Sequence, residues 1–176
     1  VNQNTYDRLV DFDPMDMEAG FKPSLAESWE VSEDGLSITF RMREGVKFHT
    51  TKFFTPTRDF NADDVVFTLD RMFNTQNAFR KANPAEFPYA VDTGMAENVA
   101  KVEKVDDYTV KMTMKKPDPD VTIKIAMPSF SILSAEYAGK LSKEGKANML
   151  NQEPVGTGPF VFERYQKDAQ IRYSAN

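Results

Sequence analysis

The stretch AESWEVSEDGLSITFRMR, residues 26–43, shows the alternating pattern of a β-hairpin. Over residues 37–43 every second residue is apolar, which is the period of two of a strand with one buried face. Residues 28–31 alternate in the same way, with a tryptophan and a valine on one side. The link at residues 32–35 ends in a glycine, which can adopt the positive φ that a tight turn requires. We therefore predict a hairpin over residues 26–43.

Two more strand pairs are predicted from short apolar runs that are bounded by turn residues. They are residues 99–105 with 108–114, and residues 160–165 with 169–173, the latter joined across 166–168. In the first pair, the strand at 108–114 alternates cleanly, whereas the three valines of its partner do not. Asp106-Asp107 provides polar turn residues between the two strands.

Two helices are predicted from capping residues and apolar stripes. Asn61 is a favourable N-cap, and Asp63 and Asp64 place negative charge in the first turn, where the helix dipole favours it. Apolar residues at 65–73 follow with helical spacing. A second helix is predicted over residues 134–144, because it begins with a capping serine and is followed by a glycine.

Periodicity alone does not decide whether one segment, residues 118–127, is a helix or a strand. Asp118-Pro119 can begin a helix, since proline is tolerated in the first turn, whereas residues 121–127 alternate like a strand. The stretch at 83–95 contains two prolines and is predicted to be a long irregular loop. Strands joined mostly by hairpins and flanked by helices predict an α+β fold, mainly an antiparallel sheet, in a single domain over residues 1–176.

The composition excludes several kinds of chemistry. The chain of 176 residues has no cysteine and one histidine, so thiolate metal sites, iron–sulfur clusters and histidine-rich active sites are excluded. The net charge of -5 argues against a nucleic-acid binder, and no apolar run approaches the length of a membrane span. We therefore expect a protein that is not an enzyme, with no catalytic residues, no metal, no cofactor, no nucleic-acid partner and no membrane insertion.

Three short motifs favour structural roles over chemical ones. Residues 156–158, Gly-Thr-Gly, lack the lysine and the following helix of a phosphate loop, and we interpret them as a tight turn that starts a strand. Asp63-Asp64 is interpreted as a helix-cap pair, because neighbouring side chains on a helix point in different directions and do not easily share one ion. Asp106-Asp107 lacks the register of a calcium loop and is interpreted as part of a turn.

The candidate binding residues are few. Met127, Phe130 and Ile132 lie in an irregular stretch that contains a proline, and we predict that they form a partly exposed apolar wall of a ligand cleft. His49 has two interpretations: it orders a loop through hydrogen bonds, which we favour, or it is a ligand for haem. Methionines at apolar strand and helix positions are predicted to fill the core.

Residues 25–49, which contain the whole of the first hairpin, resemble the signature hairpin of the family 5 extracellular solute-binding proteins. These are the peptide-type binding subunits of ABC importers. The blocks NADDVVF at 61–67, SAEYA at 134–138 and PVGTGPF at 154–160 are similar to later landmarks of the same family, in the same order. Within the family, residues 48–51, 134–138 and 152–159 are most similar to the Sap branch (sensitivity to antimicrobial peptides), and the dipeptide- and haem-binding branches are close to it.

The resemblance implies a function for the longer proteins of this family. They bind peptides, and some bind haem, in a cleft between two lobes, and they deliver the ligand to an inner-membrane permease without chemistry of their own. It also implies a periplasmic location in a Gram-negative bacterium. The chain would then correspond to part of the N-terminal lobe, largely the small extra domain that is distinctive of the family, with a short return segment near 154–176. The charged anchors for the peptide termini would lie outside it.

We therefore expect the substrate-binding component of an ABC importer for peptides, antimicrobial peptides among them, or for haem. Without a second lobe, this part should bind its ligand weakly. The alternative is a protein–protein interaction domain that docks on the transporter and binds little ligand of its own. The resemblance also favours a helix in the open segment at 118–127.

Overall fold

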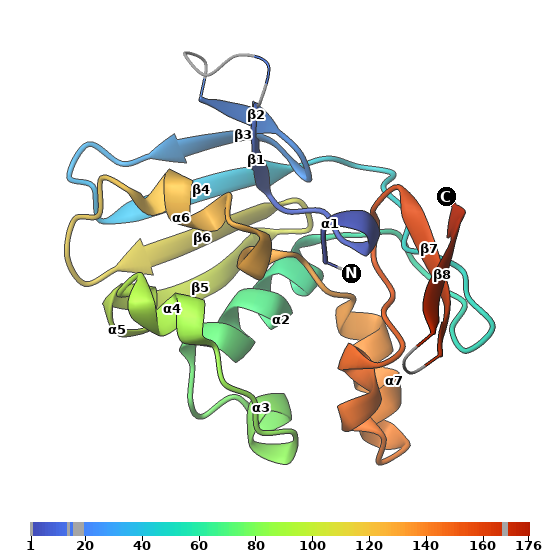
Figure 1. Cartoon of the computed structure of the whole chain (residues 1–176). Coiled ribbons are helices and arrows are strands. Elements are labelled where there is room, and N and C mark those ends of the chain that lie inside the picture. Colours follow the sequence, from blue (N-terminus) through green and yellow to red (C-terminus); the bar gives the residue numbers. More distant parts are fainter. Residues whose placement is uncertain (1, 14, 16–19, 167–168) are drawn as a thin grey trace.

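The computed structural model describes residues 2–13, 15, 20–166 and 169–176, and its central element is a four-stranded antiparallel sheet (Figure 1). The strand order is β3 (Ala26–Val31), β4 (Ser37–Met42), β6 (Thr109–Met114) and β5 (Val99–Asp106). Both predicted hairpins of this sheet are confirmed, and β4 and β6 pair with each other in its middle. Gly35 has a φ of 67° in the link between β3 and β4, so a glycine is favoured at that position.

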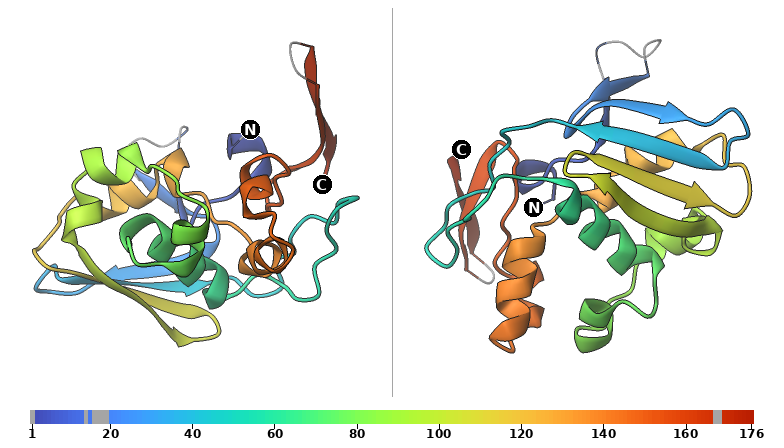
Figure 2. Two further views of the ribbon diagram at one scale, coloured as in Figure 1. Left: turned by 90° about the horizontal axis from the view of Figure 1, so that it is seen from below. Right: turned by 180° about the vertical axis from the view of Figure 1, so that it is seen from behind.

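Alternation along the strands separates a buried face of the sheet from an exposed one. Ile38, Phe40 and Met42 of β4 are buried, and so are Val110 and Met112 of the neighbouring β6. Figure 2 shows that the helices next to the sheet lie on one side of it. An antiparallel sheet commonly packs one face on a core and leaves the other in water. The predicted α+β fold is confirmed.

Strand β5 has an irregular apolar pattern because its pairing with β6 shifts twice. The shifts lie between Val99 and Lys101 and between Lys104 and Asp106. A one-residue shift moves the following side chains to the other face of a sheet. Val99 is therefore buried whereas Val105 is exposed, which explains why the valines of this strand do not alternate.

Helix α2 (Ala62–Phe73) contacts β5 and β6 and begins with a capping box. The Asn61 side chain accepts a hydrogen bond from the Asp63 N–H at 2.9 Å, and the Asp64 carboxylate accepts one from the Asn61 N–H at 3.0 Å. This exchange satisfies two donors that would otherwise have no partner at the start of a helix. The prediction of a helix that begins at Asn61 is confirmed.

Helix α7 (Ala135–Lys143) packs beside α2 and also begins at its predicted cap. The Ser134 hydroxyl accepts a hydrogen bond from the Tyr137 N–H at 3.1 Å. Gly145, with a φ of 69°, follows the last turn of the helix. The second predicted helix is therefore confirmed as well.

The prediction of an irregular loop over residues 83–95 is wrong. The chain forms α3 (Ala78–Ala82), α4 (Pro88–Asp92) and α5 (Met95–Asn98) in and around this region. None of the three is longer than five residues, which is too short for the period of a helix to appear in the sequence. Pro88 lies in the first turn of α4, where the missing N–H of proline costs no hydrogen bond.

The segment at 118–127, which periodicity left open, contains the short helix α6 (Val121–Ile125). Val121 and Ile125 are one helical turn apart and both are buried, so spacing by four residues explains the apparent alternation. The helix that the family resemblance favours is confirmed. The 3-10 helix η1 (Pro128–Phe130) follows directly and leads towards α7.

Two smaller hairpins complete the strands. They are β1 (Val10–Phe12) with β2 (Phe21–Pro23), and β7 (Phe160–Gln166) with β8 (Gln170–Ala175). The third predicted strand pair is thus confirmed, although its link at 166–168 lies partly outside the described residues. In the left view of Figure 2, β7 and β8 stand away from the rest of the molecule. Short helices α1 (Asn2–Thr5) and η2 (Ala147–Asn151) precede β1 and β7 respectively.

Gly156 and Gly158 pack closely against the backbone of Thr5. A Cβ added at Gly156 would lie 1.9 Å from the carbonyl oxygen of Thr5, and one added at Gly158 would lie 2.8 Å from the carbonyl carbon. The Gly158 N–H donates to that same Thr5 oxygen at 3.0 Å, and the Thr157 hydroxyl donates to the Asp7 carboxylate at 2.8 Å. A bend before β7 is present as predicted, but the glycines are required by this close approach of two backbones.

The helices of the described part are all too short or too polar to cross a lipid bilayer.

Candidate functional site

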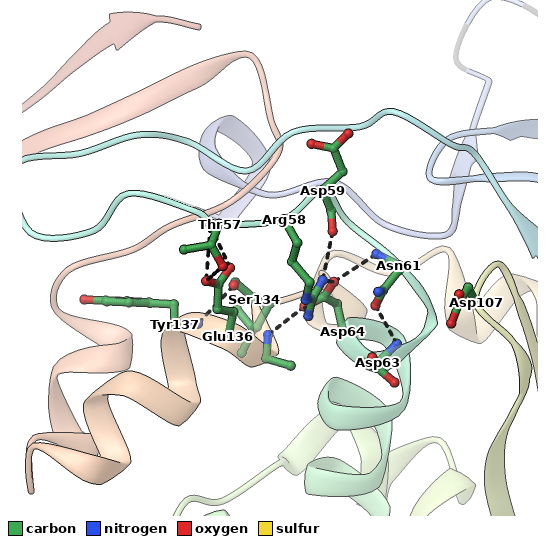
Figure 3. Close-up of polar contacts among 12 residues, drawn as sticks. Thr57, Arg58, Asp59, Asn61, Asp63, Asp64, Asp107, Ser134, Glu136 and Tyr137 are labelled. Carbon is green, nitrogen blue, oxygen red and sulfur yellow. Dashed lines mark hydrogen bonds and ion pairs between the residues drawn. The ribbon is translucent and has the colours of Figure 1, made fainter.

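The first turn of α2 is attached to α7 and to the preceding loop by one buried carboxylate. Asp64 is fully buried and accepts two hydrogen bonds from the Arg58 guanidinium, at 2.7 and 2.9 Å, and one from the Ala135 N–H at 2.8 Å. Figure 3 shows these groups converging on Asp64. The hydrogen bond to Asp64 raises the pKa of Arg58 above its ordinary value. Asp64 also accepts the Asn61 N–H in the capping box. It therefore joins the loop that contains Arg58, the start of α2 and the start of α7.

A second contact attaches the loop before α2 to α7. The Glu136 carboxylate accepts hydrogen bonds from the Thr57 N–H, at 3.1 and 3.2 Å, and from the Thr57 hydroxyl at 2.5 Å (Figure 3). Glu136 lies in the first turn of α7, where a carboxylate is favourable. The loop and the two helix starts therefore form one polar cluster.

One turn further along α2, Thr68 fixes the segment that leads into α7. Its hydroxyl donates to the Asp64 carbonyl at 2.8 Å and accepts from the Leu133 N–H at 3.0 Å. The Ile132 N–H donates to the carbonyl of Asp7 at 2.9 Å, which attaches the same segment to the start of the chain. Residues 128–134 consequently run along the face of α2 that carries Asp64, Thr68 and, one turn later, Arg71.

This arrangement leaves a recess between the last turns of α2, the start of α4 and the segment at 127–133. It consists of two adjoining pockets with volumes of about 470 and 380 Å³. The pockets share three lining residues, which are Met72, Phe87 and Ser129. Volumes of a few hundred Å³ are typical of sites for small ligands. We call these two pockets together "the recess". The pocket of about 470 Å³, beside α4, is the outer pocket, and the pocket of about 380 Å³, which Arg71 and Tyr6 line, is the inner pocket.

Arg71 lines the inner pocket of the recess, and its side chain is buried, which is unusual for a cation. The residue is only 6% exposed, and its guanidinium carbon lies 5.2 Å from the ring centre of Phe87 and 5.9 Å from that of Phe79. Burial lowers the pKa of Arg71, as does the neighbouring Arg80, whereas Tyr6 acts in the opposite direction. An arginine nevertheless stays protonated in proteins. The recess therefore has a positive charge against its inner wall.

The structure places the predicted wall residues in different environments. Met127 is half-buried and lines the outer pocket, and Phe130 lines it too, although only 1% of Phe130 is exposed. Ile132 is also 1% exposed, and both it and Phe130 belong to the core, so neither has the partial exposure that was predicted, although Phe130 still lines a pocket. The physical reason is the hydrogen bond of the Ile132 backbone to Asp7, which draws the segment inwards.

Sequence reasoning missed Arg71, although a signal was present. Arg71 lies three residues after Thr68 and seven after Asp64, so it shares their side of α2 beside the apolar stripe. A charged residue on a buried helix face is rarely fully buried unless it has a partner or a function. Phe87 and Tyr89, which line the outer pocket, were missed because α4 was not predicted.

A larger pocket of about 580 Å³ lies between η2 and the hairpin of β7 and β8. Its walls mix charged side chains, among them Lys52, Glu153 and Arg164, with partly exposed apolar ones. It contains no buried cation comparable to Arg71. We therefore take the recess as the candidate binding site.

His49 lies away from the recess, beside the contact between residues 5–7 and 156–158. It is 1% exposed, and its Nε2 is 2.8 Å from the Gly158 carbonyl while its Nδ1 accepts from the Gly156 N–H at 3.4 Å. These partners assign the neutral form with the proton on Nε2. Burial lowers the pKa of His49, which is consistent with a neutral ring. Both ring nitrogens are occupied by the backbone, and this geometry is that of a histidine that orders a loop.

Replacement of His49 by alanine should destabilise the protein in a pH-dependent way. At pH 7.5 we expect a loss of about 2 kcal/mol, from the lost hydrogen bonds and the cavity. Because the folded pKa lies below the ordinary value of about 6.5, the unfolded chain binds more protons in this range, and the histidine's contribution decreases as the pH falls below about 6.5. Urea denaturation of both proteins at pH 7.5 and 5.0 measures this, and an equal difference at the two pH values would contradict it.

Together, the α+β fold and the recess give a sheet-and-helix framework with a cavity of the size that small ligands occupy. Within residues 2–13, 15, 20–166 and 169–176, no three His, Asp or Glu side chains are placed to hold a metal ion. The model of the bacterial extracellular solute-binding proteins, family 5, matches residues 20–176, and the chain belongs to this family. The family consists of solute-binding proteins and not of enzymes.

Its relatives include proteins that are named for two kinds of ligand. The chain is 53% identical over 176 residues to di/tripeptide-binding protein 1 of Pseudomonas aeruginosa, with 99% of this chain and 32% of the relative covered. It is 47% identical over 175 residues to heme-binding protein A of Haemophilus influenzae, with the same two shares. The chain therefore spans about a third of the length of these relatives.

The solved structures agree with this assignment. The dipeptide-binding protein of Pseudoalteromonas sp. SM9913, in complex with Met-Leu, superimposes with a TM-score of 0.95 at 39% sequence identity. The match covers 100% of this chain and 34% of that protein. The fold described above is thus the fold of one part of a solute-binding protein.

Proposed function

We propose that this chain is part of the substrate-binding component of an ABC importer for peptides or haem. In this role it works in the periplasm of a Gram-negative bacterium and passes its ligand to an inner-membrane permease. The observation that carries the proposal is the recess, with its aromatic lining and its buried cation, in a member of a solute-binding family. The relatives named for di/tripeptides and for haem support both ligand classes. Antimicrobial peptides belong to the first class, and a preference for them stays a prediction.

The recess can serve as one wall of a cleft that closes over a ligand. Phe87 and Met127, which are both partly exposed, line it with apolar surface. A two-lobed protein gains affinity from contacts that both lobes make with the same ligand, and ligand binding favours the closed state. A chain that corresponds to part of the N-terminal lobe supplies only a share of those contacts.

The proposal predicts weak binding by this chain and tight binding by a longer protein that contains it. We expect the dissociation constant for Met-Leu or for haem to be at least about 100-fold higher for this chain, the equivalent of about 3 kcal/mol. Isothermal titration calorimetry of both proteins with both ligands measures the difference. Equally tight binding by the two proteins would contradict the shared-cleft part of the proposal, and no binding by the longer protein would contradict the proposal as a whole.

The alternative role is docking on the transporter as a protein–protein interaction domain. One observation favours it: Tyr89 and Val91 of α4 are 60% and 62% exposed, which is unusual for two large apolar side chains on a single short helix. If the longer protein binds neither peptide nor haem in the titration above, this docking role becomes the better explanation of the exposed pair.

A further inference from the structure

We propose that His49 is a pH-sensitive latch, which holds the root of the β7–β8 hairpin while its ring is neutral and releases this root when the ring is protonated. By the root we mean residues 156–159 and Asn176, which flank the two strands. The inference does not depend on the proposed function, because it concerns a contact within the chain and involves no ligand.

The first argument is the way in which the root is attached. The His49 N–H donates to the Gly156 carbonyl at 2.8 Å, and the ring contacts the root through both of its nitrogens. The Gly158 carbonyl, 2.8 Å from Nε2, also accepts from the Asn176 side chain at 3.1 Å, so both ends of the hairpin meet at this oxygen. Beyond the root, a pocket of about 580 Å³ separates the hairpin from η2, and the hairpin stands away from the sheet (Figure 2). The orientation of the hairpin therefore depends on its root.

The second argument is that the contact fits only the neutral ring. With its proton on Nε2, the ring donates to the Gly158 carbonyl and accepts from the Gly156 N–H. A protonated ring carries a hydrogen on both nitrogens, so its Nδ1–H would face the Gly156 N–H, one donor against another. Gly156 has little room to move away, because the Thr5 backbone fills the space beside its Cα. A released ring can donate to water from both nitrogens, so protonation favours release.

The third argument is the charge around the ring. Residues 155–159 and 176 carry no titratable side chain. The titratable groups near the ring come from two other segments, and they are Tyr6 and Asp7 of the first segment and Lys47 and Lys52 of its own. Both lysines are exposed, and the Asp7 carboxylate favours the protonated ring. Burial outweighs Asp7 and lowers the pKa of the histidine. The released ring, with an ordinary pKa of about 6.5, therefore binds a proton more readily than the held ring.

Nuclear magnetic resonance of the untagged protein labelled with 15N tests the ring directly. His49 is the single histidine of the sequence, so the ring signals are assigned without ambiguity. We expect the proton on Nε2 at pH 7.5 and a pKa below about 6.5 in the folded protein. A ring that titrates at or above this value would overturn the proposal, because protonation would then not favour release.

Amide hydrogen exchange at pH 7.5 and 5.0, corrected for the intrinsic rate at each pH, measures the release itself. The reporters are the N–H groups of Gly156 and Gly158 in the root and that of Met42, which donates to the Tyr108 carbonyl at 2.8 Å in the sheet. Protection of the root should fall at least about threefold on acidification, and at most about 30-fold, the limit for one group with a released pKa of about 6.5. Met42 should stay better protected than the root at both pH values. A smaller change in the root, or equal protection of all three amides, would overturn the proposal.

His49→Gln is the deciding variant, because glutamine offers a donor and an acceptor but does not titrate. Its root should lose the pH dependence, and a pH dependence equal to that of the parent protein would show that another group titrates there and that the latch is wrong. If this variant does not fold, the ring titration and the exchange of the parent protein still decide the question.

Thr157→Val is the matched control. It removes another side-chain hydrogen bond of the same root, from the Thr157 hydroxyl to the Asp7 carboxylate at 2.8 Å, and leaves the titrating ring in place. It should lower the protection of the root at both pH values and keep the ratio between them. A loss of that ratio in this variant would contradict the assignment of the pH dependence to His49.

Discussion

Replacing Asp64 by asparagine should lower the free energy of unfolding by about 3 kcal/mol. The carboxylate accepts hydrogen bonds from Arg58, from Asn61 and from the N–H of Ala135, and it is fully buried. An amide in its place turns one acceptor into a donor that faces other donors, and it leaves the Arg58 guanidinium without its partner. Urea denaturation followed by circular dichroism gives the change from the shift in midpoint.

The matched control is the neighbouring acidic residue. Asp63 lies in the same turn of α2 but is exposed, and its ion pair with Lys104, at 3.1 Å, is a surface contact. Surface ion pairs contribute at most about 1 kcal/mol, so Asp63→Asn should shift the midpoint very little. A loss below about 1 kcal/mol for Asp64→Asn would show that Asp64 does not hold the three segments together.

Gly156→Ala should destabilise the protein by at least about 3 kcal/mol. The added Cβ would lie 1.9 Å from the carbonyl oxygen of Thr5 and 2.8 Å from a ring carbon of Tyr6. Because the close partner is backbone, it cannot move aside without breaking the contact between the first and last segments. Thermal and urea denaturation both measure the effect.

Gly139→Ala provides the contrast for this prediction. Gly139 lies inside α7, and a Cβ added there meets nothing within 4 Å. Alanine favours a helix over glycine by about 0.5–1 kcal/mol, so this variant should be more stable than the parent protein. Similar effects of the two substitutions would contradict the role assigned to the backbone contact at Gly156.

The predictions from sequence succeeded where the deciding interactions are local. The hairpin at 26–43 and the helix that begins at Asn61 were predicted because alternation and capping depend on neighbours in the chain. The three short helices around 78–98 were missed because each spans too few residues to show a period.

The candidate site was harder to predict because it depends on contacts between distant segments. Ile132 faces the core because its backbone bonds to Asp7, and no local pattern reveals that partner. Arg71 becomes the inner wall of a recess only once Leu133 is fixed to Thr68 and the segment at 127–133 lies along α2. Gly156 was predicted to serve a turn, and its actual constraint is the backbone of a residue about 150 positions earlier in the chain.

That last contact also bears on the order of events during folding. The strands β3, β4, β6 and β5 pair only with one another, within residues 26–114. The hydrogen bond from Gly158 to Thr5 and that from Thr157 to Asp7, in contrast, form only when two parts of the chain that are 150 residues apart meet. Closing so long a loop is entropically costly and slows folding. The contact between residues 5–7 and 156–158 is therefore expected to be among the last to form when the unfolded protein refolds.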